Sequence, residues 1–438
     1  MRRRAPLAAL GLTALVACAH HPAVPAPAPA PVAVATSTIA PSATADRLPL
    51  STPEAEGMDS RPLLALADAV RDRDFPALSI LVSRHGRLVY ELYTSSLSGD
   101  EAHYVMSVTK TFVSALVGIA IGEHLLPPAD ASIADVLPAT LFPSEDARAA
   151  LRPITIDDVL GMSALDAPDP PRVHTPEAQA RLVAFLRSPS RVRFALAQAP
   201  LVRPGSDFQY NDTSPMLATG MLHHATRQTA FDYARTRLFE PMGFRHYEWM
   251  HQDPASVDNG GYGLRVRPVD MQKLGLLYLR HGEWNGRQLI PREWVERSFT
   301  PWNRAHGSIE PNYGSYWWTL RFGSGWTAHA ALGWKGQRIA VFPEQDLVVT
   351  MTALVEEGDE TAAFAGLVNK FLIPSVAGDV PRTEDPAVRT ALAARLAELR
   401  RGPSRILAST EPRMVPTVAP KGTHRAWAPL VSDESRAR

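Results

Sequence analysis

The sequence has very little of several features that usually indicate a function. Its 438 residues include one cysteine, and Lys plus Arg equal Asp plus Glu at 45 each, so the formal net charge is zero. A single cysteine excludes disulfides within the chain and metal clusters held by thiolates. A neutral chain gives no electrostatic reason to expect nucleic acid as a partner.

Several common catalytic and cofactor motifs are also missing. The chain has no His-Glu-x-x-His zinc helix and no Gly-x-x-x-x-Gly-Lys-Ser/Thr phosphate loop. It has no Gly-x-Gly-x-x-Gly dinucleotide fingerprint and no Gly-x-Ser-x-Gly nucleophile elbow. We therefore expect neither a metal nor an organic cofactor, and no nucleophile of the α/β-hydrolase kind.

The N-terminal segment has the pattern of an export signal. "MRRR" is a positively charged start, and the apolar run after it is too short for a comfortable transmembrane helix. The run ends in "LVAC", which places the only cysteine, Cys18, where bacterial lipoproteins carry their lipid. This resemblance implies an exported protein that is tethered by a lipid on Cys18. Ala19 after it favours the periplasmic face of the outer membrane or the cell surface.

Composition divides the chain into four parts. We expect residues 1–18 to be a lipoprotein signal peptide and the Ala/Pro-rich residues 19–47 to be an extended linker. A folded domain is expected over 48–376. Residues 377–438 are expected to contain one helix, in "DPAVRTALAARLAELRRG", and then a disordered tail without periodicity.

The domain alternates strand-like and helix-like runs. The sequence predicts a helix over 60–73 with an N-cap serine, and a hairpin that turns at Gly86. It predicts one long helix over 103–126 and another over 268–280. Three strand-like runs between 313 and 355 precede a closing helix near 361–374. Strands at both ends with helices between them predict an α/β fold, whose one sheet is assembled from early and late segments.

Ser107 and Lys110 lie three residues apart in the first turn of the helix predicted in "HYVMSVTKTFVSALVGIAIGEHLL". Such residues share a face, where the helix dipole and free N–H groups suit a developing oxyanion. Burial and a positive field would lower the pKa of Lys110, so that it can take a proton from serine. The alternative is that Ser107 caps the helix while Lys110 reaches water. The apolar run "TFVSALVGIAI" offers no polar face, which favours a nucleophile with its base.

A phenol that could pass a proton to a leaving group follows later. Tyr210 lies in "PGSDFQYNDTSPMLATG" at a turn into a helix, followed by Asn211 and Asp212. A half-buried structural tyrosine is the alternative interpretation.

With "SVTK", "YND" and a late glycine-rich strand in this order, the chain resembles the serine β-lactamase and penicillin-binding-protein superfamily. It is most similar to the relatives of class C enzymes that include esterases and 6-aminohexanoate-oligomer hydrolases. Supporting stretches such as "SILVSRHGRLVYE", "GYGLRVRPVDMQKLGLLYLRHGEWNGRQLIPREWV" and "ALGWKGQRIAVFPEQDLVVTMTA" extend the match over about 48–374. The resemblance implies a β-lactamase-like fold, with an antiparallel sheet flanked by N- and C-terminal helices and an all-helical subdomain.

The resemblance also implies roles. Ser107 would be the acylated nucleophile, Lys110 its base partner, and Tyr210 the donor to the leaving group. Asp212 stands where the family's Tyr-x-Asn motif ends in asparagine, which would change its contact to a substrate amide. "ALG", ending at Gly333, takes the place of the family's Lys-Thr-Gly. The remaining predicted substrate-binding residues follow it: Trp334, Gly336 and Gln337. Backbone N–H groups of Ser107 and Trp334 would form the oxyanion hole.

The missing lysine of the third motif affects the expected substrate. It normally helps to bind a carboxylate, and Lys335, Arg338 and Arg265 are the candidates to replace it. We therefore expect a serine hydrolase of the esterase or amidase type, acting on small-molecule esters or amides or on a cell-wall peptide. The alternatives are a β-lactamase or D-alanyl-D-alanine carboxypeptidase, and a catalytically silent cell-wall-binding lipoprotein.

Overall fold

The computed structural model describes residues 47–72, 75–94, 99–167, 176–201, 204–205, 207–250, 257–301, 312–355 and 359–401. The predicted lipidation at Cys18, the signal peptide, nearly all of the linker and the predicted C-terminal tail lie outside these residues.

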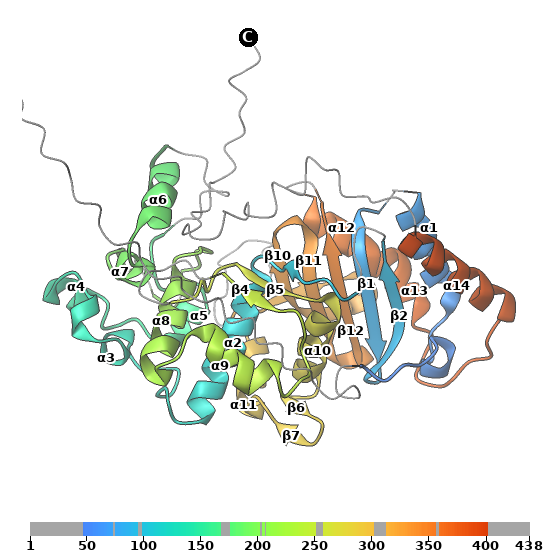
Figure 1. Cartoon of the computed structure of the whole chain (residues 1–438), viewed down its shortest axis with the longest axis horizontal. Helices are drawn as coiled ribbons and strands as arrows, with labels where there is room; N and C mark the ends of the chain where they lie inside the picture. The colour runs from blue at the N-terminus through green and yellow to red at the C-terminus, as the bar shows by residue number, and fades with distance from the viewer. Residues whose placement is uncertain are drawn as a thin grey trace, which may run out of the picture. The chain divides into compact units, whose positions relative to one another are not determined.

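The centre of the domain is a seven-stranded antiparallel sheet with strand order β2-β1-β12-β11-β10-β9-β8 (Figure 1). The pairing of β1 with β12 sets Ile80 opposite Met351, so early and late segments join in one sheet, as expected. The strands are β1 (Ala77–Arg84), β2 (Arg87–Tyr93), β8 (Asn312–Tyr313), β9 (Trp318–Arg321), β10 (Thr327–Gly333), β11 (Gln337–Phe342) and β12 (Leu347–Ala353).

Successive side chains of a strand point to opposite sides of the sheet. Because all residues of β1 and β12 are buried, both faces of the sheet are covered by other elements. Ile80 packs into the apolar cluster shared with α1 (Ser60–Arg71), α12 (Glu360–Leu367) and the π-helical turn η7 (Val368–Leu372). Leu81 faces the other cluster, with α2 (Val108–Gly122) and α10 (Pro268–Leu279). A Cβ at Gly275 would lie 2.4 Å from Val348 Cγ1, so the glycine lets α10 lie close against β12.

A largely helical region packs around α2, which contacts α8, α9 and the π-helical turn η3. The helices of this region are α3 (Ile133–Val136), α4 (Glu145–Ala150), α5 (Ile156–Leu160), α6 (Pro176–Arg187), α7 (Arg191–Leu196), α8 (Ser214–Thr226), α9 (Ala230–Ala234) and η3 (Arg235–Phe239). Further elements are α11 (Arg292–Phe299), the sheet β3-β5-β4 (His103–Tyr104, Leu264–Val266, Glu248–Trp249), and the pair β6 (Glu283–Trp284) and β7 (Arg287–Gln288). Together these elements confirm the predicted α/β, β-lactamase-like architecture.

Local structure departs from the predictions at two element starts. The segment predicted as one helix over 103–126 begins instead with β3, and α2 starts at Val108. The reason is tertiary, because His103 pairs with Val266 of β5, far along the chain. Helix α1 is capped by Asp59, whose side chain accepts from Arg61 N–H, rather than by a serine. The turn expected at Gly86 is present.

The helix predicted near the C-terminus is α14 (Pro386–Arg401), and it packs against α1 and β2. Its Leu392 and Leu399 are buried in the same cluster as the side chains of α1, and Arg395 forms an ion pair with Asp68. The folded unit therefore continues through Arg401, past the boundary expected at residue 376. Within the described ranges, no helix combines the length and the apolar character needed to cross a membrane.

Candidate active site

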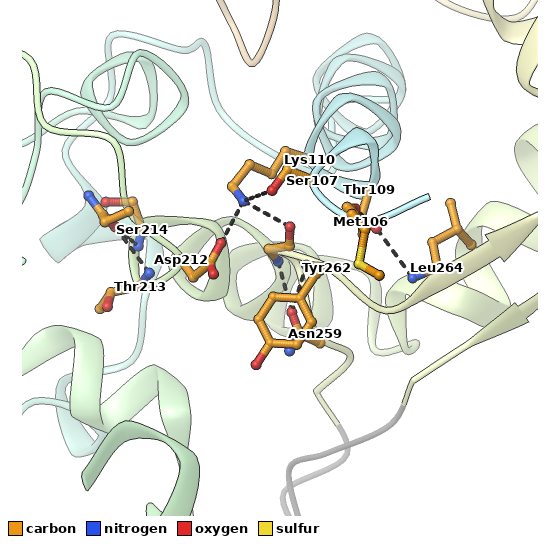
Figure 2. A network of polar contacts seen from close by, with 12 residues as sticks. Met106, Ser107, Thr109, Lys110, Asp212, Thr213, Ser214, Asn259, Tyr262 and Leu264 are labelled. Carbon is orange, nitrogen blue, oxygen red and sulfur yellow. Dashed lines mark hydrogen bonds and ion pairs between the residues drawn. The ribbon is translucent and has the colours of Figure 1, made fainter. Parts of the chain in front are cut away.

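Ser107 directly precedes the first residue of α2, but its hydroxyl forms no hydrogen bond to a backbone amide of that helix. The capping interpretation of Ser107 is therefore wrong. Its Oγ instead accepts a hydrogen bond of 3.0 Å from Lys110 Nζ (Figure 2). The residue before it, Met106, has a positive φ of 49°. A non-glycine residue in that region costs roughly 1–3 kcal/mol, a strain that is concentrated at functional sites.

Lys110 is almost completely buried, with 1% of its side chain exposed. Its Nζ donates to three acceptors: Ser107 Oγ at 3.0 Å, Asp212 Oδ1 at 2.6 Å and the carbonyl oxygen of Gly261 at 2.8 Å. An ammonium has three N–H bonds. The contacts around Lys110 are therefore those of a fully satisfied ammonium group.

The electrostatics of Lys110 are opposite to the prediction. Burial by itself lowers the pKa of this amine, but the Asp212 carboxylate and Tyr210 raise it, and the resulting pKa is well above the ordinary value for lysine. The expectation of a lowered pKa is therefore wrong. It counted burial and the helix dipole but not the carboxylate, which lies 102 residues away in sequence.

Asp212 is held at the start of α8 by its neighbour. Asn211 Oδ1 accepts hydrogen bonds from the N–H groups of Thr213 (3.0 Å) and Ser214 (2.6 Å), so it fixes the turn that leads into α8. The Asp212 side chain is 29% exposed, with one oxygen on Lys110. Asp212 was expected to contact substrate, and the structure shows that it is also the charge partner of Lys110.

A turn over 259–262 supplies the third acceptor of Lys110 and was missed in the sequence. Asn259 Oδ1 accepts hydrogen bonds from Gly261 N–H and Tyr262 N–H, each at 2.9 Å (Figure 2). The turn lies so close to α8 that a Cβ at Gly260 would be 2.3 Å from Pro215 O. An asparagine followed by two glycines was the available signal, because it is typical of a tight turn whose backbone approaches a neighbour closely.

Tyr210 completes the group. Lys110 Nζ lies 4.8 Å from the centroid of its ring. The ring packs against Trp318, with centroids 5.7 Å apart, and against Tyr313 at 6.3 Å. The structure therefore brings together four residues predicted from two separate motifs, beside the packed rings of Tyr313 and Trp318. These residues are Ser107, Lys110, Tyr210 and Asp212.

The third predicted motif lies against the turn that precedes Ser107. A Cβ on Gly333, the last residue of β10, would be 2.4 Å from Val105 O and 3.3 Å from Met106 Cβ. The end of β10 therefore touches the two residues that precede Ser107. Trp334, half-buried, follows Gly333 in a short 3₁₀ turn, Trp334–Gly336.

The other two residues of this motif have structural contacts. A Cβ at Gly336 would approach Ala353 Cβ to 2.9 Å, and its positive φ of 95° suits glycine. The side-chain amide nitrogen of Gln337, Nε2, donates to Ala353 O at 2.8 Å and to Trp334 O at 3.3 Å. Gly336 therefore shapes the turn and the Gln337 side-chain amide ties it to β12, while their contact with a substrate stays a prediction.

The three candidate cations differ in their surroundings. Arg265 donates to Glu248 Oε2 at 2.8 Å and to Ala102 O at 3.0 Å. Arg338 is buried and donates to backbone carbonyls, and its burial lowers its pKa to about 10. Lys335 lies with its Nζ 5.0 Å from the ring centroid of Trp334. The structure thus gives Arg265 and Arg338 internal partners instead of a place to receive a substrate carboxylate.

No set of three or more His, Cys, Asp and Glu side chains that could hold a metal ion occurs among the residues that the structure describes. The antiparallel sheet, covered on both faces by helices, and the buried helix α2, which Ser107 directly precedes, are the features of a β-lactamase-like serine-hydrolase fold.

Comparison with family models identifies the family. The Beta-lactamase family model matches residues 57–367, and the chain belongs to this family. A search of curated protein sequences gives no significant match.

Solved structures share the fold at low sequence identity. One is a candidate 6-aminohexanoate-dimer hydrolase from Bacillus anthracis, 19% identical with a TM-score of 0.58 over 73% of this chain and 86% of that one. The octameric penicillin-binding protein homologue from Pyrococcus abyssi is 15% identical, with a TM-score of 0.56 over 73% and 79%. The hydrolase EstCE1, with promiscuous acyltransferase activity, is 15% identical, with a TM-score of 0.56 over 73% and 99%.

Proposed function

We propose that this protein is a serine hydrolase that cleaves ester or amide bonds of small molecules through an acyl-enzyme on Ser107. One observation carries the proposal. The Ser107 hydroxyl is not used as a helix cap but receives a hydrogen bond from a buried ammonium, Lys110, at the positive end of a buried helix. A structural serine at this position would cap the helix, and a structural lysine would reach water.

The contacts of Lys110 support an order of proton transfer. Because Asp212, Gly261 and Ser107 accept all three of its N–H bonds, Lys110 works as a cation that stabilises the developing alkoxide. As Oγ bonds to the substrate carbonyl carbon, the Ser107 proton passes to the Tyr210 oxygen while the proton of the Tyr210 hydroxyl passes to the leaving group. The ester or amide bond to that leaving group then breaks. Water releases the acyl group by the reverse sequence.

The surroundings of the site favour uncharged acyl groups. The rings of Tyr210, Tyr313 and Trp318 pack against one another beside Lys110, and Arg265 and Arg338 are bound to internal partners. This supports an esterase or amidase more than a β-lactamase or carboxypeptidase, which must bind a carboxylate. We further propose from the sequence that a lipid on Cys18 tethers the domain to a bacterial membrane, which a mass shift lost in Cys18→Ala would test.

The test is the intact mass of the protein after exposure to a fluorophosphonate. We expect one adduct on the wild type, none on Ser107→Ala, and an adduct on Ser114→Ala, a buried serine of the same helix. A fluorescent penicillin and uncharged p-nitrophenyl esters then separate the substrate classes. An unlabelled, folded wild type would refute the proposal and favour the silent cell-wall-binding scaffold. Rapid penicillin labelling without ester turnover would favour the carboxypeptidase or β-lactamase alternative.

A further inference from the structure

Arg338 is a buried arginine in the middle of the sheet, on strand β11. Only 4% of it is exposed, and it lies opposite Leu332 of β10. By the alternation of the strand it shares a face with Ala340 and Phe342, which pack into the cluster of α1 and α12. The helix α2 covers the other face. A guanidinium in such a place is costly unless specific partners hold it.

Its partners are carbonyl groups at the turn between β10 and β11. Arg338 Nη1 donates to Gly333 O at 2.5 Å and to Gln337 O at 2.9 Å. The shorter of these bonds is formed with the peptide group that joins Gly333 to Trp334. A hydrogen bond from a cation is shorter and stronger than one between neutral groups. Arg338 therefore fixes the orientation of this peptide group.

The same peptide group has a second end, its N–H. The bond between Gly333 and Trp334 is trans, so the N–H points away from the carbonyl oxygen. The Cα of Gly333 abuts Val105 O, in the turn that leads into Ser107. With its oxygen held by Arg338, the peptide directs the Trp334 N–H to the opposite side, and Gly333 lies close to the turn that precedes Ser107.

We propose that Arg338 is a positioning residue that orients and polarises the Gly333–Trp334 peptide group as part of an oxyanion site. This inference rests on the hydrolase function proposed above. As Ser107 Oγ bonds to the substrate carbon, the π electron pair of the carbonyl moves to its oxygen. The N–H groups of Trp334 and Ser107 stabilise that negative charge. A cation on the carbonyl end makes the N–H a stronger donor, because hydrogen bonds in series polarise one another.

Two other roles for Arg338 predict different measurements. If its guanidinium bound a substrate carboxylate, its loss would raise KM for anionic substrates. If it only stabilised the fold, its loss would lower thermal stability without changing the chemical step. A positioning role lowers kcat and leaves KM nearly unchanged, because the interaction matters only in the transition state.

The test compares Arg338→Met with Arg338→Lys and with a matched control, Arg84→Met. Arg84 is also buried, 1% exposed, and donates to a backbone carbonyl, Glu56 O at 3.0 Å, and to Asp379 at 2.7 Å. For each variant, the rate of phosphonylation by a fluorophosphonate and the kcat and KM for an uncharged ester are measured at a temperature where all are folded. Thermal unfolding is recorded in parallel.

We expect Arg338→Met to lower kcat and the phosphonylation rate about 10- to 100-fold, somewhat less than loss of a whole oxyanion donor, with KM within about threefold. Arg338→Lys keeps the charge and recovers part of the rate, and Arg84→Met changes stability alone. Rates for Arg338→Met equal to those of Arg84→Met, or a change in KM only, would overturn the inference. If Arg338→Met does not fold, a wild-type rate in Arg338→Lys overturns it.

The failure of this inference can be told apart from failure of the proposed function. A wild type that is labelled at Ser107, with Arg338 variants that react equally fast, leaves the hydrolase intact and removes only the role of Arg338. A folded wild type without any adduct removes both.

Discussion

Replacing Asp212 with asparagine tests whether Lys110 acts as a cation or as a neutral base. Asparagine keeps an oxygen near Nζ, where the carboxylate now lies at 2.6 Å, but removes the negative charge. The pKa of Lys110, which Asp212 raises, must then fall. If the ammonium is the working form, the alkaline limb of the kcat/KM profile moves to lower pH and the acid limb stays in place.

The size of the effect follows from the geometry. Two unit charges at this distance attract by about 6 kcal/mol at an effective dielectric constant of ~20. Water screens part of this, because the Asp212 side chain is 29% exposed, and the asparagine oxygen still accepts a hydrogen bond. A net loss of about 1–2 kcal/mol remains, typical of replacing a charged acceptor with a neutral one. It corresponds to a shift of the alkaline limb by about one pH unit or slightly more.

The same change affects stability with a defined sign. The pKa of Lys110 in the folded state lies above its unfolded value, so the pair stabilises the fold fully below about pH 10 and loses that contribution as pH rises through the folded-state pKa. Asp212→Asn should therefore unfold more easily than the wild type at pH 7, by the same ~1–2 kcal/mol.

The assay is kcat/KM for an uncharged ester, or the phosphonylation rate, measured from about pH 6 to the alkaline limit of stability. Asp59→Asn, which removes a negative charge at the cap of α1, serves as the control and should leave the profile unchanged. Higher activity of Asp212→Asn near neutral pH, with the acid limb moved to lower pH, would refute the reasoning. That result would make neutral Lys110 the base.

Three further predictions concern the third motif, a buried histidine and the last helix. Gly333→Ala should reduce the phosphonylation rate at least ~100-fold, because its Cβ would lie 2.4 Å from Val105 O. The control Gly366→Ala in α12, where a Cβ meets open space, should instead stabilise the fold by about 0.5–1 kcal/mol in thermal unfolding. Burial lowers the pKa of His329 to about 4, so between about pH 6.5 and 4 only the unfolded state binds the proton and the free energy of unfolding should decline. His329→Gln should reduce this decline by up to ~3 kcal/mol, and an unchanged pH dependence of stability would contradict the prediction. A chain ending at residue 381 lacks α14 and should be less stable in denaturant unfolding than one ending at 401, by roughly 3–6 kcal/mol, because Leu392 and Leu399 no longer cover the core. Equal unfolding midpoints would mean that α14 does not belong to the folded unit.

The parts of the fold that were predictable are those in which a short stretch carries the whole signal. The alternating runs around Gly86 predicted the β1–β2 hairpin, and the turn forms with positive φ at both His85 and Gly86, as the right-handed twist of paired strands favours. The regular spacing of apolar residues over 268–280 predicted α10 to within one residue. Segments 103–104 and 386–401 differ, because their structure or packing depends on partners far along the chain.

The candidate site divides in the same way. The sequence by itself determined that Ser107 and Lys110 lie on one face at the start of an apolar helix, because residues three apart are neighbours on a helix surface. Only the tertiary structure decided that Lys110 is a fully paired ammonium, that Gln337 ties a turn to β12, and that Arg338 reaches Gly333. These outcomes depend on charges and carbonyl groups brought together by folding, since electrostatic interactions act through distance in space and not along the chain.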